Sequence, residues 1–390
     1  MAEWIECKIC DIGTVVGGAT PSTKKAENYE CGNIAWITPK DLSTFNGRYI
    51  QRGERNITEI GLKSCSTQLL PKNTVLFSSR APIGYIAIAA NQVCTNQGFK
   101  SVIPNEATDP LFLFYLLKYN KDKIEAMGSG TTFKEVSGNT MKNIIVRVPS
   151  DKEVQKNIAS ILGTLDNKIG ENERINNNLE QQAKALYKDW FFDFSPFSTK
   201  GNLPDGWHLG TVGDIIQLHD SKRVPLSGSE RDKMEKIYPY YGATSLMDYV
   251  DNYLFDGIYL LLGEDGTVVD SLGFPILQYV YGQFWVNNHA HIITGKEGFS
   301  VEELYLFFSL TNIKSIVTGA VQQKVSQQNL KKVPAIIPSK EALSAFDDLI
   351  QPIFAQIRNL RDENAHLADL RDTLLPRLMS GELDVSDTEI

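Results

Sequence analysis

Two stretches of the sequence repeat their apolar residues at steps that alternate between three and four. The first stretch runs from about Asp151 to Phe192. Adding 188 to each of its ten seam positions gives ten positions of a second stretch, of which eight are apolar. This heptad spacing lays one apolar stripe along a helix. Because a helix of about 40 residues spans roughly 60 Å and cannot bury its stripe alone, we predict two long helices that pair with each other. The seam residues are Ile158, Leu162, Leu165, Ile169, Asn176, Leu179, Leu186 and Trp190 in the first stretch, and Ile350, Ile353, Ile357, Leu360, Asn364, Leu367, Leu374 and Leu378 in the second.

Asparagines interrupt this seam at Asn172 and Asn176, and Asn364 is the counterpart of Asn176. A seam asparagine costs stability but fixes the register, because a mispaired amide lies buried without a hydrogen-bond partner. We therefore expect Asn176 and Asn364 to fix the register, although in an antiparallel pair they need not face each other. The alternative, two unrelated amphipathic helices on separate cores, is less favoured because the two stretches share so many seam positions.

The segments outside the helices also occur twice. The segment 318–326 echoes 127–137, and the segment 286–293 echoes 94–101. A repeat on this scale predicts a duplicated module. We therefore expect a first globular domain over 1–150, a first long helix over 151–195, a linker and second globular domain over 196–338, and a second long helix and tail over 339–390. Ser150 and Glu153 have the spacing of a capping box at the start of the first helix. The predicted fold is α+β: two mixed domains, each followed by a long helix, and an antiparallel coiled coil of the two helices.

The charge is distributed unevenly. The chain has a net charge of −8, but residues 1–150 hold 17 Lys and Arg against 13 Asp and Glu, whereas 339–390 hold 5 against 11. An acidic total does not exclude DNA binding, because affinity depends on the local field and on the phosphates contacted. A basic face must therefore be local. No apolar run approaches the roughly 20 residues of a membrane span.

Motifs for catalysis and metal binding are missing. The sequence has no GxxxxGK[ST] phosphate loop, no GxGxxG after a strand and no HExxH. The pair Cys7 and Cys10 lacks the further ligands of a zinc site, and reduced cysteines in the cytoplasm are the better interpretation. His289 and His291 alternate and would share a strand face; they allow a two-ligand metal site, but a polar surface is favoured. We therefore predict no metal site, no cofactor and no catalytic residue in this chain.

Several segments together resemble one known family. They are Gly17-Gly-Ala-Thr-Pro-Ser, Trp36-Ile-Thr-Pro-Lys-Asp-Leu, Val136-Ser-Gly-Asn-Thr-Met, Leu186-Tyr-Lys-Asp-Trp-Phe-Phe-Asp-Phe, Leu203-Pro-Asp-Gly-Trp, Gly213-Asp-Ile and Leu374-Leu-Pro-Arg-Leu-Met-Ser-Gly-Glu-Leu-Asp-Val. In this combination, and with its duplicated domain-plus-helix plan, the chain resembles the specificity subunit of type I restriction-modification systems. The second domain lacks the first two segments and has Lys222-Arg-Val-Pro and Tyr238-Pro-Tyr-Tyr instead.

The resemblance implies a protein without catalysis of its own. Each domain would read one half of a bipartite double-stranded DNA target, and the paired helices would set the spacing. Two methyltransferase subunits, which would hold S-adenosylmethionine, would bind this chain, and motor-nuclease restriction subunits would join through them. The implied location is the cytoplasm, with no contact to a membrane.

The candidate DNA contacts follow from chemistry, because phosphates attract Lys and Arg, and base edges attract Arg, Lys, Asn, Gln and hydroxyl groups. Arg80 and the loops 128–134 and 319–324 are the strongest candidates, because these loops recur in both halves. The first domain offers Lys24, Lys25, Lys40, Arg48, Arg52, Arg55, Arg80, Asn96, Gln97, Lys100, Thr131, Thr132 and Lys134. The second offers Lys222, Arg223, Arg231, Lys233, Lys236, Tyr241, Thr244, His289, Gln322, Gln323 and Lys324. Each of them can also be an ordinary solvated side chain.

Two other functions stay open on sequence grounds. A non-catalytic coiled-coil scaffold with two ligand-binding heads has the same repeat, and salt-dependent DNA affinity would separate it from a DNA reader. A free-standing enzyme is disfavoured because its motifs are missing.

Overall fold

A computed structural model of the chain describes residues 3–130, 134–197, 202–319 and 322–386. The chain divides into two compact units. The first contains residues 1–172 and 362–390, and the second contains 173–361. The division passes through both long helices, so each unit holds one globular domain and half of each helix. Each unit is described by itself.

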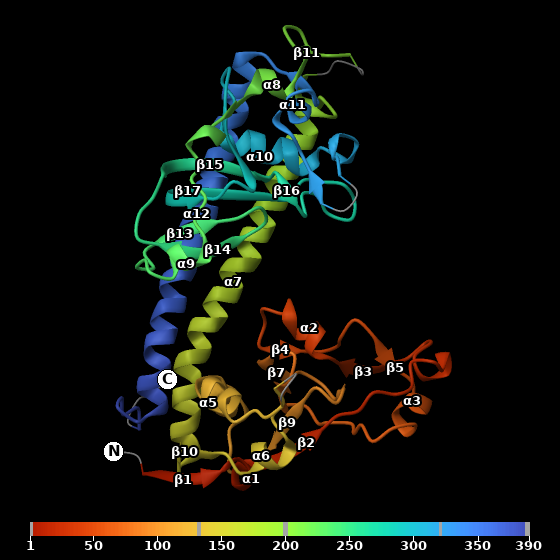
Figure 1. Cartoon of the computed structure of the whole chain (residues 1–390), viewed down its shortest axis with the longest axis vertical. Coiled ribbons are helices and arrows are strands. Elements are labelled where there is room, and N and C mark those ends of the chain that lie inside the picture. The colour runs from red at the N-terminus through yellow and green to blue at the C-terminus, as the bar shows by residue number, and fades with distance from the viewer. Residues whose placement is uncertain (1–2, 131–133, 198–201, 320–321, 387–390) are drawn as a thin grey trace. The chain divides into compact units, whose positions relative to one another are not determined.

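The two long helices are α7 (Lys152–Phe191) and α12 (Lys340–Met379), each of 40 residues. In the first unit they are antiparallel: Asp166 of α7 contacts Arg371 of α12, and Asn172 contacts Asn364. In the second unit the end of α7 meets the start of α12, where the rings of Phe191 and Phe346 lie 4.8 Å apart. Figure 1 shows both helices as continuous ribbons. The predicted fold class is therefore confirmed.

Within its described residues, the first unit carries three sheets. The largest has the strand order β2-β9-β6-β7-β4, the second β5-β3-β8, and the third pairs β1 with β10. Its main core forms between the large sheet, α4 and the helix pair, with Phe77, Phe112 and Tyr115 fully buried. The strands are β1 (Trp4–Lys8), β2 (Gly13–Gly17), β3 (Ile34–Ile37), β4 (Tyr49–Ile50), β5 (Asn56–Ile57), β6 (Val75–Ser79), β7 (Ile83–Ala89), β8 (Cys94–Thr95), β9 (Lys100–Pro104) and β10 (Ile145–Pro149). The short helices are α1 (Ile9–Ile12), α2 (Pro39–Ser43), α3 (Glu59–Lys63), α4 (Pro110–Tyr119), α5 (Lys121–Ala126) and α6 (Gly138–Lys142).

The second unit has a six-stranded sheet of order β12-β18-β15-β17-β13-β14 and two small sheets, β11-β20 and β16-β19. Its core joins this sheet to α10 and the helix pair around Phe308, Phe346 and Phe354. The strands are β11 (His208–Thr211), β12 (Ile216–Leu218), β13 (Tyr238–Tyr241), β14 (Leu246–Val250), β15 (Phe255–Gly263), β16 (Asp265–Gly266), β17 (Leu277–Val286), β18 (Ala290–Gly295), β19 (Gln323–Lys324) and β20 (Pro334–Ile337). The short helices are α8 (Val212–Ile215), α9 (Gly228–Arg231), α10 (Val301–Leu310) and α11 (Gln327–Leu330).

The repeat predicted from the sequence is a repeat of topology. The order β2-β9-β6-β7 in the first unit corresponds to β12-β18-β15-β17 in the second, and the pair β1-β10 corresponds to β11-β20. The parallel pairing of β3 with β8 has its counterpart in β13 with β17. The alignment of 286–293 with 94–101 made from the sequence is wrong by one residue. The amide of Gly98 donates to the Asn96 side chain, and the amide of His289 donates to the Asn287 side chain in the same way. Asn96 therefore corresponds to Asn287.

Among the seam residues, Ile158, Leu162, Ile350, Ile357 and Leu378 are at most 2% exposed, and each of the others is buried or half-buried. The sequence predicts that Asn176 and Asn364 fix the register without necessarily facing each other, and in the structure it is Asn172 that contacts Asn364. Asn172, which is completely buried, donates to Asn364 at 2.9 Å and to Glu363 at 2.9 Å. The Oδ1 atoms of Asn172 and Asn176 are both buried without a hydrogen-bond partner. Because the helices are antiparallel, Asn364 contacts Asn172, which lies nearer the start of α7 than Asn176, the residue that corresponds to Asn364 in the repeat.

The cap predicted at Ser150 is also wrong. The carboxylate of Asp151 accepts the Glu153 amide at 2.9 Å, and the Ser150 hydroxyl bonds the Glu3 carbonyl instead. Asp151 directly precedes the first helical residue, so its short carboxylate reaches the free amide of the first turn. None of the helices within the described ranges is long and apolar enough to span a membrane.

Candidate nucleic-acid interface

Three charged side chains gather at the base of a loop in the first domain. Glu135 accepts Lys100 at 3.2 Å and lies 3.5 Å from Arg80. Arg80 follows β6, and Lys100 begins β9, the neighbour of β6 in the sheet. We call Arg80, Lys100 and Glu135 the first clasp. It brings together two of the predicted DNA contacts and one carboxylate that the sequence analysis left out.

The backbone around the first clasp is fixed by main-chain hydrogen bonds. The Ser129 amide donates to the Glu135 carbonyl at 3.0 Å, and the Glu135 amide donates to the Ser129 carbonyl at 2.9 Å. These two bonds close the base of the loop. The amide of Val136 then bonds the Ser79 carbonyl, and the amide of Ser79 bonds the Gly98 carbonyl. The base of the loop is thus tied to the end of β6 and to the turn before β9. Of the predicted residues on this loop, Lys134 is exposed, and Thr131 and Thr132 lie outside the described residues.

The second domain builds a larger charged group at the matching place. Glu264, which follows β15, accepts Arg223 at 2.6 Å and lies 3.5 Å from Lys324. Asp220 lies 3.6 Å from Arg223 and bonds His291 at 2.6 Å. We call Asp220, Arg223, Glu264, His291 and Lys324 the second clasp. Burial raises the pKa of Asp220, but the hydrogen bond and charge of His291 together hold this pKa below its usual value.

His291 is completely buried, so the interpretation of this residue as part of a polar surface is wrong. Its Nδ1 atom faces the Asp220 carboxylate, and its Nε2 atom faces the Val325 carbonyl at 2.8 Å. Both ring nitrogens therefore face a hydrogen-bond acceptor. His289 is half-exposed and bonds Asp265 at 2.5 Å.

The oxygen and nitrogen atoms of Asp220, Glu264 and His291 lie close enough together to hold a metal ion. Their ligand atoms are engaged otherwise. Arg223 bonds Glu264, Gln327 bonds Asp220 at 2.5 Å, and both nitrogens of His291 face acceptors. A cationic guanidinium in the group replaces the charge that a metal would supply. The arrangement is an ion-pair network.

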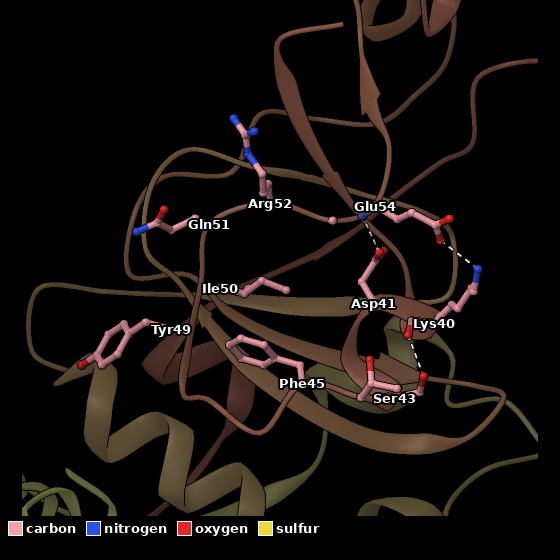
Figure 2. A pocket seen from close by; sticks show the side chains of 11 residues that line it. Lys40, Asp41, Ser43, Phe45, Tyr49, Ile50, Gln51, Arg52 and Glu54 are labelled. Carbon is pink, nitrogen blue, oxygen red and sulfur yellow. Dashed lines mark hydrogen bonds and ion pairs between the residues drawn. The ribbon is translucent and has the colours of Figure 1, made fainter. Parts of the chain in front are cut away.

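A pocket of about 480 Å³ opens in the first domain around α2 and β4. Figure 2 shows Phe45 and Tyr49 along its lower side and the pair Lys40 and Glu54 at one end. The Lys40 ammonium lies 2.8 Å from Glu54, which raises the pKa of Lys40. Arg52 is exposed on the rim. The pocket therefore combines predicted DNA contacts with aromatic rings.

Arg48 lies where the first domain meets the helix pair. It donates to the Tyr115 hydroxyl at 3.1 Å and to Asn167 of α7. The Tyr115 hydroxyl donates to Asp166 at 2.5 Å, and Asp166 also accepts Arg371 at 2.8 Å. Burial and the adjacent Asp166 raise the pKa of Tyr115, which therefore stays a neutral donor. Arg48 thus contributes to docking the domain on its helices.

The other predicted contacts are not members of the clasps, although Lys222 and Gln323 stand next to clasp residues in the sequence. Arg55 stacks over the Tyr29 ring, 4.0 Å from its centroid, and Arg231 pairs with Asp248 at 2.8 Å, as Lys236 does at 3.0 Å. Side chains with a polar neighbour include Lys25 beside Glu27, Gln97 with Thr20, and Asn96 in its own turn. Exposed positions are Lys24, Lys222, Lys233, Thr244 and Gln322, whereas Tyr241 and Gln323 are half-buried. Whether any of these residues touches DNA stays a prediction.

Sequence reasoning missed the anionic members Glu135, Glu264 and Asp220 because it sought groups that attract phosphate. A signal was present for two of them. Glu135 ends one of the two recurring loops, and Glu264 stands in an acidic turn between β15 and β16.

Comparison with known proteins defines the family. The family model described as "Type I restriction modification DNA specificity domain" matches residues 1–181 and 204–365. The chain is 34% identical over 421 residues to the type I restriction enzyme MjaIX specificity subunit of Methanocaldococcus jannaschii, an alignment that covers 99% of this chain and 94% of that protein. It is 23% identical over 372 residues to the EcoprrI specificity subunit of Escherichia coli, covering 90% and 89%.

The fold has a solved counterpart. The crystal structure of a type I restriction-modification S subunit from M. genitalium superposes with a TM-score of 0.56 at 17% identity, covering 97% of this chain and 96% of that one. That likeness concerns the fold, whereas the family match and the archaeal relative extend over nearly the whole sequence. The chain belongs to the family of type I restriction-modification specificity subunits, whose domain is one for DNA specificity.

Proposed function

We propose that the chain reads a bipartite double-stranded DNA target, one half-site with each domain. The observation that carries this proposal is the repeated loop frame. The bonds Ser129–Glu135, Val136–Ser79 and Ser79–Gly98 recur as Thr318–Lys324, Val325–Glu264 and Glu264–His289. Two copies of one frame, each with cations at its base, are what a protein needs to read two half-sites.

The helix pair serves as the spacer in this proposal. Each domain is docked on α7 through a hydroxyl–carboxylate contact, Tyr115 with Asp166 in the first unit and Tyr305 with Glu180 in the second. Buried docking of this kind limits rotation of a domain on its helices. A spacer of fixed length would then set the distance between the half-sites.

The partners follow from the family and are part of the proposal. Two methyltransferase subunits bind this chain and carry S-adenosylmethionine, and restriction subunits with motor and nuclease activity join through them in the cytoplasm. This chain supplies target selection and contributes no catalytic group. A phosphate-binding surface suits this role, because backbone contacts position a protein on DNA while base contacts select the sequence.

The test is to map methylated bases in cells that carry this chain with its methyltransferase subunit. The proposal predicts one methylated bipartite motif, weakened in Arg80→Ala and Lys324→Ala variants that assemble normally. An assembled complex that adds no methylation would contradict the proposal and favour the scaffold alternative. Normal methylation in both variants would remove these residues from the interface and leave the family assignment intact.

A further inference from the structure

The two clasps have the same backbone frame, but the sign of the charge differs at two of its matched positions. Matching the backbone hydrogen bonds of the two domains pairs Glu135 with Lys324. Each closes its loop by main-chain hydrogen bonds to the residue six positions earlier, Glu135 to Ser129 and Lys324 to Thr318. The same frame matches Arg80 with Asp265, the residues after Ser79 and Glu264. At two matched positions, therefore, an anion in one domain stands where the other has a cation.

The remaining matched positions follow from the same frame. Lys100 stands two residues after Gly98, as His291 stands two residues after His289, and Ser79 is matched by Glu264. The loop residue at the base is thus an anion held by cations in the first domain, and a cation held by an anion in the second. Each arrangement is electrostatically consistent, whereas exchanging Glu135 and Lys324 would place like charges together in both domains.

We propose that Glu135 and Glu264 are positioning residues. Each holds the cations beside one of the two recurring loops, Glu135 at the loop 128–134 and Glu264 at the loop 319–324. This inference rests on the proposed function and extends it. Glu135 keeps Arg80 and Lys100 together at the loop base, and Glu264 does the same for Arg223 and Lys324. Because the charges at these two matched positions have opposite signs, the residue at each loop base suits the charges of its own domain, and each carboxylate influences only its own half-site.

The exposure of these side chains makes the first clasp testable without unfolding the protein. Arg80 and Glu135 are 36% and 38% exposed, and ion pairs this open to water contribute little to stability. Lys100, at 15%, is more buried, but Ser79 also lies 3.4 Å from its ammonium. A variant at Glu135 should therefore fold while its loop base rearranges.

The experiment uses the chain assembled with its methyltransferase subunits and three duplexes at one salt concentration: the full target, and the target with either half-site scrambled. Discrimination is the ratio of affinities for the full and scrambled duplexes. Both Glu135→Lys and Glu135→Gln should lower discrimination at the first half-site about tenfold, a loss on the scale of one mismatched base pair. Glu135→Asp, which keeps the charge, should retain most of it.

The matched control is Asp122→Lys, which makes the same change of charge at an exposed position of the same domain. Added positive charge strengthens binding to all DNA, so Asp122→Lys should raise every affinity and leave both ratios unchanged. If Glu135→Lys and Asp122→Lys behave alike, the clasp has no positioning role and the proposal fails.

The second domain gives the reciprocal test. Glu264→Gln should lower discrimination at the second half-site only. If Glu264→Gln impairs folding because Arg223 loses its partner, Glu264→Asp is measured instead, since it keeps the charge on a shorter side chain. Equal losses at both half-sites would overturn the assignment of one carboxylate to one half-site. The proposed function fails separately, if the unaltered complex shows no preference for the full target over either scrambled duplex.

Discussion

At the scale of single residues, buried polar groups in this chain have specific partners, and the exceptions are informative. Asn172 is completely buried; its amide group donates to both Glu363 and Asn364, but its Oδ1 atom has no hydrogen-bond partner. Glu303 is also completely buried; one carboxylate oxygen accepts the Ser300 amide at 2.8 Å, and the other has no hydrogen-bond partner. The amide of Asn172 therefore fixes how the two long helices pair, whereas the buried carboxyl of Glu303 at the start of α10 lowers the stability of the fold.

Removing the amide of Asn172 should destabilise the helix pair. In Asn172→Leu the carboxylate of Glu363, which is 42% exposed, can turn to water. The amide oxygen of Asn364 instead loses its donor inside the helix pair, and an unsatisfied group there costs about 1–3 kcal/mol. We expect the free energy of unfolding of the single variant to fall by this amount. Asn172→Leu/Asn364→Leu should recover part of the loss, because two apolar residues then meet. Denaturant unfolding measures both changes, and an equal loss in both variants would exclude the asparagine contact as their cause.

Glu303 predicts a dependence of stability on pH. Burial raises its pKa to about 8, from 4.5. Above pH 4.5 the unfolded chain releases this proton while the folded chain keeps it, so this group lowers stability as pH rises from 4.5 to about 8. Glu303→Gln keeps the acceptor for Ser300 and cannot ionise. We expect it to stabilise the fold by about 1–3 kcal/mol at pH 7 and by nothing at pH 4. A gain of the same size at both pH values would exclude ionisation as the cause.

At the scale of elements, each domain is tied to the long helices by a tyrosine, a carboxylate and an arginine. In the first unit Asp166 of α7 joins Tyr115 of α4 to Arg371 of α12. In the second unit Glu302 of α10 joins Tyr279 of β17 to Arg358 of α12, at 2.6 and 3.0 Å. These contacts link a sheet-covering helix to the helix pair, so docking depends on a few buried charges as well as on apolar area.

Changing Asp166 tests this docking. Asp166 is 13% exposed and Arg371 17%, so Asp166→Asn leaves a largely buried guanidinium with a weaker partner, at a cost of about 2 kcal/mol. The control is Asp372→Asn, which removes the other carboxylate beside Arg371. Asp372 is 60% exposed, and its loss should cost less than about 0.5 kcal/mol. Unfolding of the two variants in denaturant compares them directly, and equal costs would argue against a buried docking contact.

The sequence predicts the elements better than their partners. The heptad spacing of residues such as Ile158 and Ile350 indicates two helices, because an apolar stripe reflects burial directly. It does not identify Tyr187, Phe191 and Phe354, which are buried although they lie off the seam, because they pack between the helices and the second domain. Part of each clasp was predictable from the sequence, because Lys100 and Lys324 are polar residues of recurring segments. Their carboxylate partners depend on which strands lie side by side, and spacing along the chain does not contain that information.

At the scale of the whole molecule, the duplication extends to the chain ends. In the second unit the segment after α7 folds back so that Phe197 packs on Trp207, with ring centroids 4.9 Å apart. In the first unit the segment after α12 does the same: Gly381 and Val385 line a pocket with Trp4, near the start of the chain. Arg147 covers the Trp4 ring and bonds the Ser380 carbonyl. The last described residues therefore belong to the core of the first unit.

This contact predicts that the C-terminal segment stabilises the first domain. Val385 is 8% exposed, so Val385→Asp would bury a carboxylate against apolar neighbours and should cost about 2 kcal/mol or more. Glu382→Ala, at an exposed residue of the same segment, should change stability by less than about 1 kcal/mol. Hydrogen exchange of β1 amides would locate the effect, and β1 protection unchanged in Val385→Asp would show that the segment does not support the first domain.

The central claim is that two independent readers share one helix pair, and exchanging one reader tests it most directly. Residues 3–150 are replaced by the matching region of a relative with a different target, and methylated bases are mapped in cells that also contain the methyltransferase subunit. We predict a new motif that differs from the original on one side only, with the other half-site and the spacing retained. A change on both sides, or loss of all sequence preference in a complex that still assembles and methylates DNA, would contradict the claim.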